Sequence, residues 1–263
     1  MKSSELVSVI IPIYNAFHTV GFTIDSVLSQ TYRNLEVIII DDSSSNEGID
    51  KLEKYYEGDH RINIIRLENN LGVWNARNVG IKSSKGRYIA FCDADDLWHA
   101  KKLEKQIALM VKEEADIVFS SYDIVDADGN KIGQDLISKT KIQYTDMLYY
   151  NHIGNLTAIL DSEQIGKPEQ QNIHHEDYAM WLKLMRIGPT VIGITEPLAA
   201  YRVHSSNLTK NKVRSLVWHY NVLKNSENIN TFNSIYYTLI GRLRLFYKKV
   251  IRRKYPNQPC NTS

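Results

Sequence analysis

Four short runs of aliphatic residues give the first third of the chain a regular pattern. They span residues 7–11, 35–40, 62–67 and 88–92. Most of their positions are apolar without alternation, which is typical of strands that are covered on both faces, as in a parallel sheet. The pattern therefore predicts four parallel strands.

Apolar residues between these runs recur at helix spacing. Val20, Ile24, Val27 and Leu28 follow one such stripe, and a narrower one begins at Val73. They predict the crossover helices of β-α-β units, whose right-handed connections place helices on both faces of a sheet. Further along we expect a helix from about residue 99, a strand over 117–121, a helix from about residue 177 and a helical segment over 206–263. Residues 131–175 show only weak periodicity.

Composition indicates an ordinary globular protein. The chain has 263 residues, of which 43% are hydrophobic and 24% are charged, and these values exclude disorder or a coiled coil as a description of the whole chain. The two cysteines, Cys92 and Cys260, are too few for a disulfide framework. No run approaches the roughly 18 apolar residues of a membrane span, and no cleavage region follows residues 7–13. We therefore expect a cytoplasmic protein.

The charge is distributed unevenly. Residues 1–204 carry 21 Lys and Arg against 29 Asp and Glu, whereas residues 205–263 carry 11 against the single Glu227. A basic end on an acidic body predicts a polyanionic partner, such as nucleic acid or anionic lipid. The segment lacks a nucleic-acid-binding motif and an aromatic stacking array, so we expect no nucleic acid.

Acidic residues follow two of the predicted strands directly. Asp41 and Asp42 follow one strand, and Asp93, Asp95 and Asp96 follow another. The carboxyl ends of parallel strands meet at one edge of a sheet, where ligands bind. Carboxylates gathered there repel one another unless a cation neutralises them, and Mg²⁺ and Mn²⁺ prefer oxygen ligands. The alternative is that these residues form solvated turns or helix caps.

At these residues the chain resembles the family 2 glycosyltransferases, inverting enzymes with the GT-A fold that use nucleotide sugars. The resemblance covers about residues 6–205 and is carried by six ordered segments, which are residues 8–15, 26–32, 40–44, 70–80, 91–98 and 175–182. It implies an α/β fold with a Rossmann-like, mostly parallel central sheet flanked by helices. It also implies a catalytic domain over 1–205, with a nucleotide-binding half over 1–115 and an acceptor-binding half over 116–205. A basic helical extension over 206–263 follows.

The resemblance implies a donor site at the strand ends. Asp42 would accept a hydrogen bond from the imide of a base, which favours a UDP- or dTDP-sugar. Tyr14 would offer its ring to the base or simply pack at the strand end, and Arg77 would neutralise the diphosphate or lie on a solvated helix face. The implied donor-binding residues are Pro12, Tyr14, Asn15, Asp42, Arg77, Asp93 and Asp95.

The resemblance also implies a divalent cation, Mn²⁺ or Mg²⁺. Asp95 would ligate it, with Asp93 contacting the ribose or the cation. Asp96 would join the ligands or cap the next helix, and His204 would be a further ligand or an ordinary surface histidine.

Asp177 is the general base that the resemblance implies. Inversion requires a proton acceptor on the side of the sugar opposite the leaving group, and therefore away from the cation. The alternative is that Asp177 only begins a helix, held there by the helix dipole.

These assignments predict an enzyme that transfers a sugar from a nucleotide donor to a glycan or lipid-linked glycan, in the synthesis of a surface polysaccharide such as O-antigen or capsule. A nucleotidyltransferase that makes the nucleotide sugar is one alternative, although residues 12–15 lack its glycine-rich basic loop. A noncatalytic module that associates with membranes is another.

Apolar residues over 236–251 fall on one helical stripe, with basic residues largely outside it. Two interpretations stay open. Residues 236–254 lie in an anionic membrane surface, on the inner face of the plasma membrane, or the helix packs its stripe on the domain and leaves its cations in water.

Overall fold

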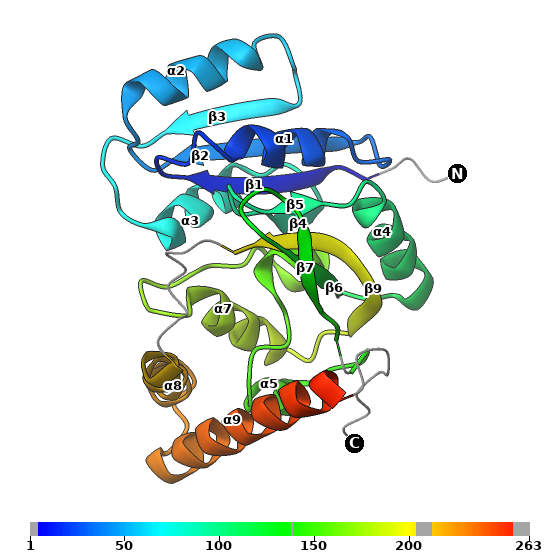
Figure 1. The fold of residues 1–263 in the computed structure, drawn as a ribbon, viewed down its shortest axis with the longest axis vertical. Coiled ribbons are helices and arrows are strands. Elements are labelled where there is room, and N and C mark those ends of the chain that lie inside the picture. Colours follow the sequence, from blue (N-terminus) through cyan, green and yellow to red (C-terminus); the bar gives the residue numbers. More distant parts are fainter. Residues whose placement is uncertain (1–4, 138, 204–211, 255–263) are drawn as a thin grey trace.

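The computed structural model describes residues 5–137, 139–203 and 212–254, which form a curled central sheet flanked by helices (Figure 1). The sheet has nine strands, in the order β3-β2-β1-β4-β8-β6-β9-β5, with β7 paired to β6. The strands are β1 (Val7–Ile13), β2 (Leu35–Asp41), β3 (Ile62–Arg66), β4 (Tyr88–Phe91), β5 (Leu97–Trp98), β6 (Ile117–Val125), β7 (Lys131–Asp135), β8 (Ile159–Asp161) and β9 (Val191–Arg202).

The first four strands are parallel, as the apolar runs predict. β1 lies between β2 and β4, with Val7 opposite both Leu35 and Tyr88, and β3 extends the sheet beyond β2. Every residue of β1 is buried, because helices cover both faces of this part of the sheet. The four predicted strands are therefore confirmed.

Two of the helices that connect these strands, and the helix between β5 and β6, also agree with the predicted helical segments. They are α1 (Val20–Leu28), α3 (Val73–Ser83) and α4 (Lys102–Glu113). The helix α2 (Asn46–Tyr55) has no counterpart among the predicted helices. Gly80 lets α3 approach the sheet closely, since a Cβ there would lie 2.5 Å from Cγ2 of Ile10.

The second half of the sheet is mixed. β8 pairs antiparallel with both β4 and β6, whereas β6 and β9 are parallel. Residues 131–175, where periodicity is weak, form short pieces that cannot display a long pattern. Besides β7 and β8, these are α5 (Tyr144–Met147), the 3₁₀ turn η1 (Asn155–Thr157) and α6 (Ser162–Ile165).

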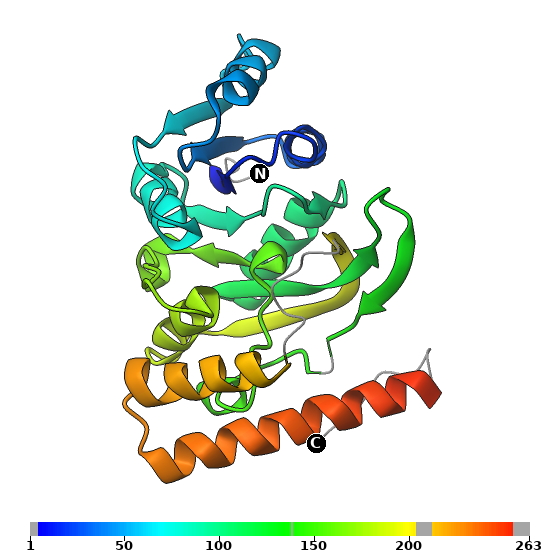
Figure 2. The ribbon, with the colours of Figure 1, turned by 60° about the vertical axis from the view of Figure 1, so that its left-hand side comes forward.

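After α7 (Glu176–Met185) and β9, the described residues 212–254 are mainly helical, as expected. It forms α8 (Lys212–Asn221), the π-helical turn η3 (Val222–Ser226) and α9 (Thr231–Lys254). Figures 1 and 2 place α9 at the end of the molecule away from α2. The division of the chain into domains stays a prediction.

The helix α9 docks through small and polar residues and through Tyr237, rather than through its apolar stripe. Ser234, Thr238 and Gly241 are buried, whereas Leu239 and Leu243 are exposed. The interpretation in which α9 packs its apolar stripe on the domain is therefore wrong for these residues.

Gly241 marks the closest approach of α9 to the domain, because a Cβ there would lie 1.7 Å from the carbonyl oxygen of Tyr149. We predict that Gly241→Ala lowers the free energy of unfolding by about 1–3 kcal/mol through overpacking. Gly21→Ala in α1 is the matched control. It meets no atom within 4 Å, so it should stabilise the protein by about 0.5 kcal/mol through helix propensity. Urea unfolding measures both, and stabilisation by Gly241→Ala would contradict the docking of α9.

Candidate active site

The acidic residues singled out in the sequence lie at one edge of the sheet. Asp41 ends β2, Asp42 follows it, and Asp93 lies two residues beyond the end of β4. Because β1 pairs in parallel with both β2 and β4, the carboxyl ends of these strands face the same way. The expectation that the two acidic clusters share an edge is confirmed.

The loop after β1 is tied to the loop after β2. The backbone N–H of Asn15 donates to Oγ of Ser44 at 2.8 Å, and Oδ1 of Asn15 accepts from the N–H of Ser45 at 3.1 Å. Asn15 adopts a positive φ of 51°, which asparagine tolerates better than most residues. The neighbouring Tyr14 is exposed, whereas Pro12 is buried within β1.

Asp42 is buried and fixes the loop that precedes α3. Its Oδ1 accepts from the N–H of Leu71 at 3.0 Å, and its Oδ2 accepts from the N–H of Gly72 at 2.8 Å. Gly72 has a φ of 94°, a conformation that a side chain would disfavour. The carboxylate therefore links the end of β2 to the start of α3.

Buried groups bind the loop after β4 through hydrogen bonds. Oγ1 of Thr23 donates to the carbonyl of Asp96 at 2.8 Å, and Nε of Arg202 donates to the carbonyl of Asp95 at 2.9 Å. Oδ1 of Asp96 accepts from the N–H of Arg202 at 3.1 Å. Burial, and then the charges of Asp93 and Asp95, raise the pKa of Asp96 well above its ordinary value.

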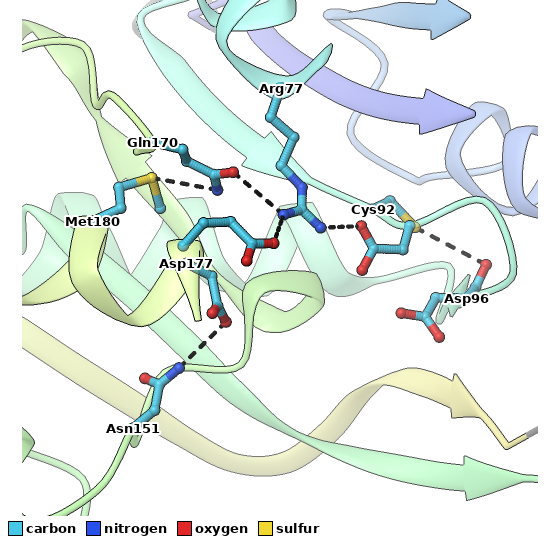
Figure 3. Close-up of polar contacts among 9 residues, drawn as sticks. Arg77, Cys92, Asp96, Asn151, Gln170, Asp177 and Met180 are labelled. Carbon is cyan, nitrogen blue, oxygen red and sulfur yellow. Dashed lines mark hydrogen bonds and ion pairs between the residues drawn. The ribbon is translucent and has the colours of Figure 1, made fainter. Parts of the chain in front are cut away.

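Arg77 joins this loop to α7 (Figure 3). Its Nη2 donates to Oδ1 of Asp93 at 2.6 Å, and its Nη1 donates to Oε1 of Glu176 at 3.0 Å and to Oε1 of Gln170 at 3.3 Å. The guanidinium is buried. The pKa of Arg77 is raised, because the attraction of Asp93 and Glu176 outweighs the opposing effect of its burial.

Asp177 is the second residue of α7 and lies beside this cluster. Nδ2 of Asn151 donates to its Oδ2 at 3.3 Å (Figure 3). Burial, and then the charge of Glu176, raise the pKa of Asp177 to about 6, although Arg77 opposes the shift. The carboxylate is therefore a proton acceptor that titrates close to neutrality.

The structure brings Arg77, Asp93 and Asp177 together, and three further residues join them that the sequence analysis did not assign to the site. Glu176 directly precedes Asp177 in the sequence, whereas Gln170 and Asn151 carry no sequence signal. His204 lies outside the described residues. The functional roles of all the site residues stay predictions.

The donor set suits a hard divalent cation. Asp93 and Asp95 are only partly buried and lie on one loop, and Oδ2 of the buried Asp96 has no hydrogen-bond partner in the structure. In the part of the chain that the structure describes, no group of three or more His, Cys, Asp or Glu residues could hold a metal. Mg²⁺ and Mn²⁺ commonly need only one or two carboxylates together with substrate phosphates, so the residues fit such a cation.

Comparisons with known proteins identify relatives of this chain. The family model described as "Glycosyl transferase family 2" matches residues 8–172. The "Putative teichuronic acid biosynthesis glycosyltransferase TuaG" of Bacillus subtilis (strain 168) is 38% identical over 208 residues, which are 79% of this chain and 82% of that protein. The Escherichia coli "UDP-Glc:alpha-D-GlcNAc-diphosphoundecaprenol beta-1,3-glucosyltransferase WfgD" is 36% identical over 235 residues. These are 89% of this chain and 91% of that protein.

Among solved structures, S. aureus TarS 1-349 in complex with UDP-GlcNAc superposes with a TM-score of 0.66 at 17% identity. The match covers 87% of this chain and 69% of that chain. At this identity the similarity concerns the fold alone, and it confirms the predicted GT-A fold.

Replacing Arg77 tests the bridge between the acidic loop and α7. We predict that Arg77→Met lowers the free energy of unfolding by about 3 kcal/mol, because it leaves Asp93 and Glu176 without their shared cation. Arg66→Met is the matched control, since Arg66 also bonds two carboxylates, Asp50 and Glu53, but at the surface. It should cost about 0–1 kcal/mol. Equal losses in urea unfolding would contradict a special role for the buried bridge.

The raised pKa of Asp177 predicts a pH-dependent cost to stability. Its folded pKa of about 6 lies above the ordinary value of 3.8, so ionisation costs stability as the pH rises through this window. Asp177→Asn removes the cost, and we expect its Tm to exceed that of the wild type by about 2–6 °C at pH 8. The difference should shrink as the pH falls from 6 towards 4.

Thermal melting across this pH range measures the effect. Asp128→Asn, which removes an exposed carboxylate from a turn, should show no such trend. A difference for Asp177→Asn that does not depend on pH would contradict the assigned pKa.

Proposed function

The chain belongs to glycosyl transferase family 2, and from this premise we propose that it transfers a sugar from a UDP- or dTDP-sugar to a glycan hydroxyl, with inversion, during synthesis of a bacterial surface polysaccharide. One observation carries the proposal. The buried Arg77 connects the acidic loop after β4 with the helix that bears Asp177, a carboxyl whose pKa is raised to about 6.

We assign donor binding to the loops after β1 and β2. The carboxylate of Asp42 accepts two backbone hydrogen bonds, which leaves lone pairs for the imide N–H of uracil or thymine. Tyr14 is 55% exposed and offers a ring face to the base. The names of WfgD, which includes UDP-Glc, and of the TarS complex, which includes UDP-GlcNAc, support a uridine nucleotide.

We assign the divalent cation to Asp93 and Asp95. When bound, Mn²⁺ or Mg²⁺ offsets the negative charge that develops on the departing diphosphate. Arg77 orients Asp93 for this task, because Nη2 of Arg77 holds Oδ1 of Asp93 and leaves the other carboxylate oxygen available. Asp96 is more deeply buried and fixes the loop through the N–H of Arg202.

We assign the general base to Asp177. Asn151 and the backbone N–H of Tyr178 bind the carboxylate, which would accept the proton of the acceptor hydroxyl as that hydroxyl attacks the anomeric carbon. A pKa of about 6 keeps the group largely ionised at neutral pH while it stays a stronger base than an ordinary aspartate. The attack requires no covalent intermediate with the enzyme.

We propose a lipid-linked glycan as the acceptor, supported by WfgD, whose name specifies an α-D-GlcNAc-diphosphoundecaprenol. Such an acceptor places the reaction at the cytoplasmic face of a membrane. The name of TuaG, which specifies teichuronic acid biosynthesis, supports a role in polymer synthesis.

Two substitutions separate chemistry from donor binding. We predict that Asp177→Asn lowers kcat by about 10²–10⁴-fold, the usual contribution of a general base, while UDP binding in Mn²⁺ is unchanged. Asp95→Ala should weaken UDP binding in Mn²⁺. The assay follows UDP or dTDP release from UDP-glucose, UDP-GlcNAc and dTDP-glucose with an alkyl-diphosphate-linked GlcNAc acceptor, and calorimetry follows UDP binding.

Full turnover by Asp177→Asn would contradict the base assignment, and unchanged calorimetry for Asp95→Ala would contradict the cation assignment. A nucleotidyltransferase would instead release pyrophosphate from UTP or dTTP and a sugar phosphate. A noncatalytic module would release neither product.

A further inference from the structure

The helix α9 presents a continuous apolar face to solvent. Its members are each 46–79% exposed and, at 3.6 residues per turn, fall within an arc of about 120°. We call this set the apolar face of α9, and its members are Phe232, Ile235, Tyr236, Leu239, Leu243, Phe246 and Tyr247. A contiguous patch of this kind on a protein surface indicates an interaction site.

The opposite side of α9 is the side that packs on the protein. Ser234, Thr238 and Gly241 are buried there, and Nδ1 of His219 lies 3.0 Å from Oγ1 of Thr238. Cζ of Arg244 lies 3.8 Å from the centre of the Tyr149 ring. These contacts hold α9 at the edge of the molecule (Figures 1 and 2) and leave its apolar face exposed.

The charge of this region identifies the partner. The segment Thr231–Lys254 contains seven Lys and Arg residues and no Asp or Glu, and α8 adds Lys212 and Arg214. Of the seven, Lys248 pairs with Asp135 of the domain. Helix periodicity places Arg242 at one edge of the apolar face and Arg244 towards the other. A second copy of this chain seated on the face would bring these like charges together, whereas anionic phosphates would neutralise them.

We propose that the apolar face of α9 lies in the interface of an anionic lipid bilayer, with the helix parallel to the membrane plane and its basic side chains at the phosphate headgroups. An apolar face flanked by cations is the pattern of helices that lie on membranes. Within the described ranges, no helix is long and apolar enough to cross a bilayer, so the contact is superficial.

Membrane contact through α9 would also orient the candidate site. A cavity of about 200 Å³ under α9 is lined by Arg242, Tyr149, Asn151 and His175, and Asn151 is the residue that holds Asp177. The part of the molecule nearest the bilayer would therefore include the residues around the candidate base. The membrane proposal itself does not depend on the proposed reaction.

Vesicle co-sedimentation of the full chain tests the proposal. We expect wild type to bind vesicles of phosphatidylcholine with 30% phosphatidylglycerol at least tenfold more tightly than vesicles of phosphatidylcholine alone, and to bind less at 0.5 M than at 0.1 M NaCl. The variant L239Q/L243Q/F246Q should reduce the partition coefficient at least tenfold. Glutamine keeps helix propensity, so α9 should remain folded.

The control variant F22Q/V111Q/I187Q replaces three apolar residues of similar exposure elsewhere on the surface and should bind vesicles as wild type does. Circular dichroism checks that both variants are folded. Equal vesicle binding by the α9 variant, or no binding by wild type, would overturn the proposal. A dimer in sedimentation velocity that L239Q/L243Q/F246Q dissociates, without vesicle binding by wild type, would assign the face to a second copy instead. If wild type binds vesicles but transfers no sugar, the proposed function is refuted and the membrane proposal stands.

Discussion

The arrangement of the candidate site depends on one buried guanidinium. Arg77 contacts Asp93 on the loop after β4 and Glu176 at the start of α7. One cation therefore connects the carboxyl edge of the parallel strands with a helix about a hundred positions later in the chain. Taking an arginine out of water is costly, and two carboxylates offset that cost only when the geometry holds both of them. The bridge therefore fixes how α3, the acidic loop and α7 lie relative to one another.

The same bridge leaves an imbalance of charge that gives the site its chemistry. One guanidinium faces Asp93, Glu176 and Asp177, so negative charge exceeds positive charge before any ligand binds. The excess, together with burial, raises the pKa of Asp177, while Arg77 limits the increase. It also favours a divalent cation near Asp93 and Asp95. The raised pKa of the proposed base and the proposed binding of a cation are thus explained by one arrangement.

The sequence predicts most of the fold of the first half of the chain because its signals are local. Each of the first four strands is an uninterrupted apolar run, and α1 and α3 show helix-spaced stripes. Residues 131–175 escape prediction because their elements are only three to five residues long. The residues of the candidate site likewise fall into those with a local sequence signal and those without one. Arg77, Asp93 and Asp177 stand in recognisable segments, whereas Gln170 and Asn151 join them only through tertiary contacts.

The helix α9 shows a different limit of sequence reasoning. Periodicity identifies its apolar stripe, but it cannot say whether that stripe faces the protein or solvent. The packing decides this. Gly241 allows α9 to approach the carbonyl of Tyr149 at a distance that no larger residue permits. Ser234 and Thr238 add little bulk to the contact, and Tyr237 packs edge-on against the ring of Tyr149. A helix that is docked by its small residues leaves its large apolar residues in water, where each costs free energy. Such a design is consistent with a second partner on the outer side, and the seven cations and absent acids of the segment match a surface of phosphates.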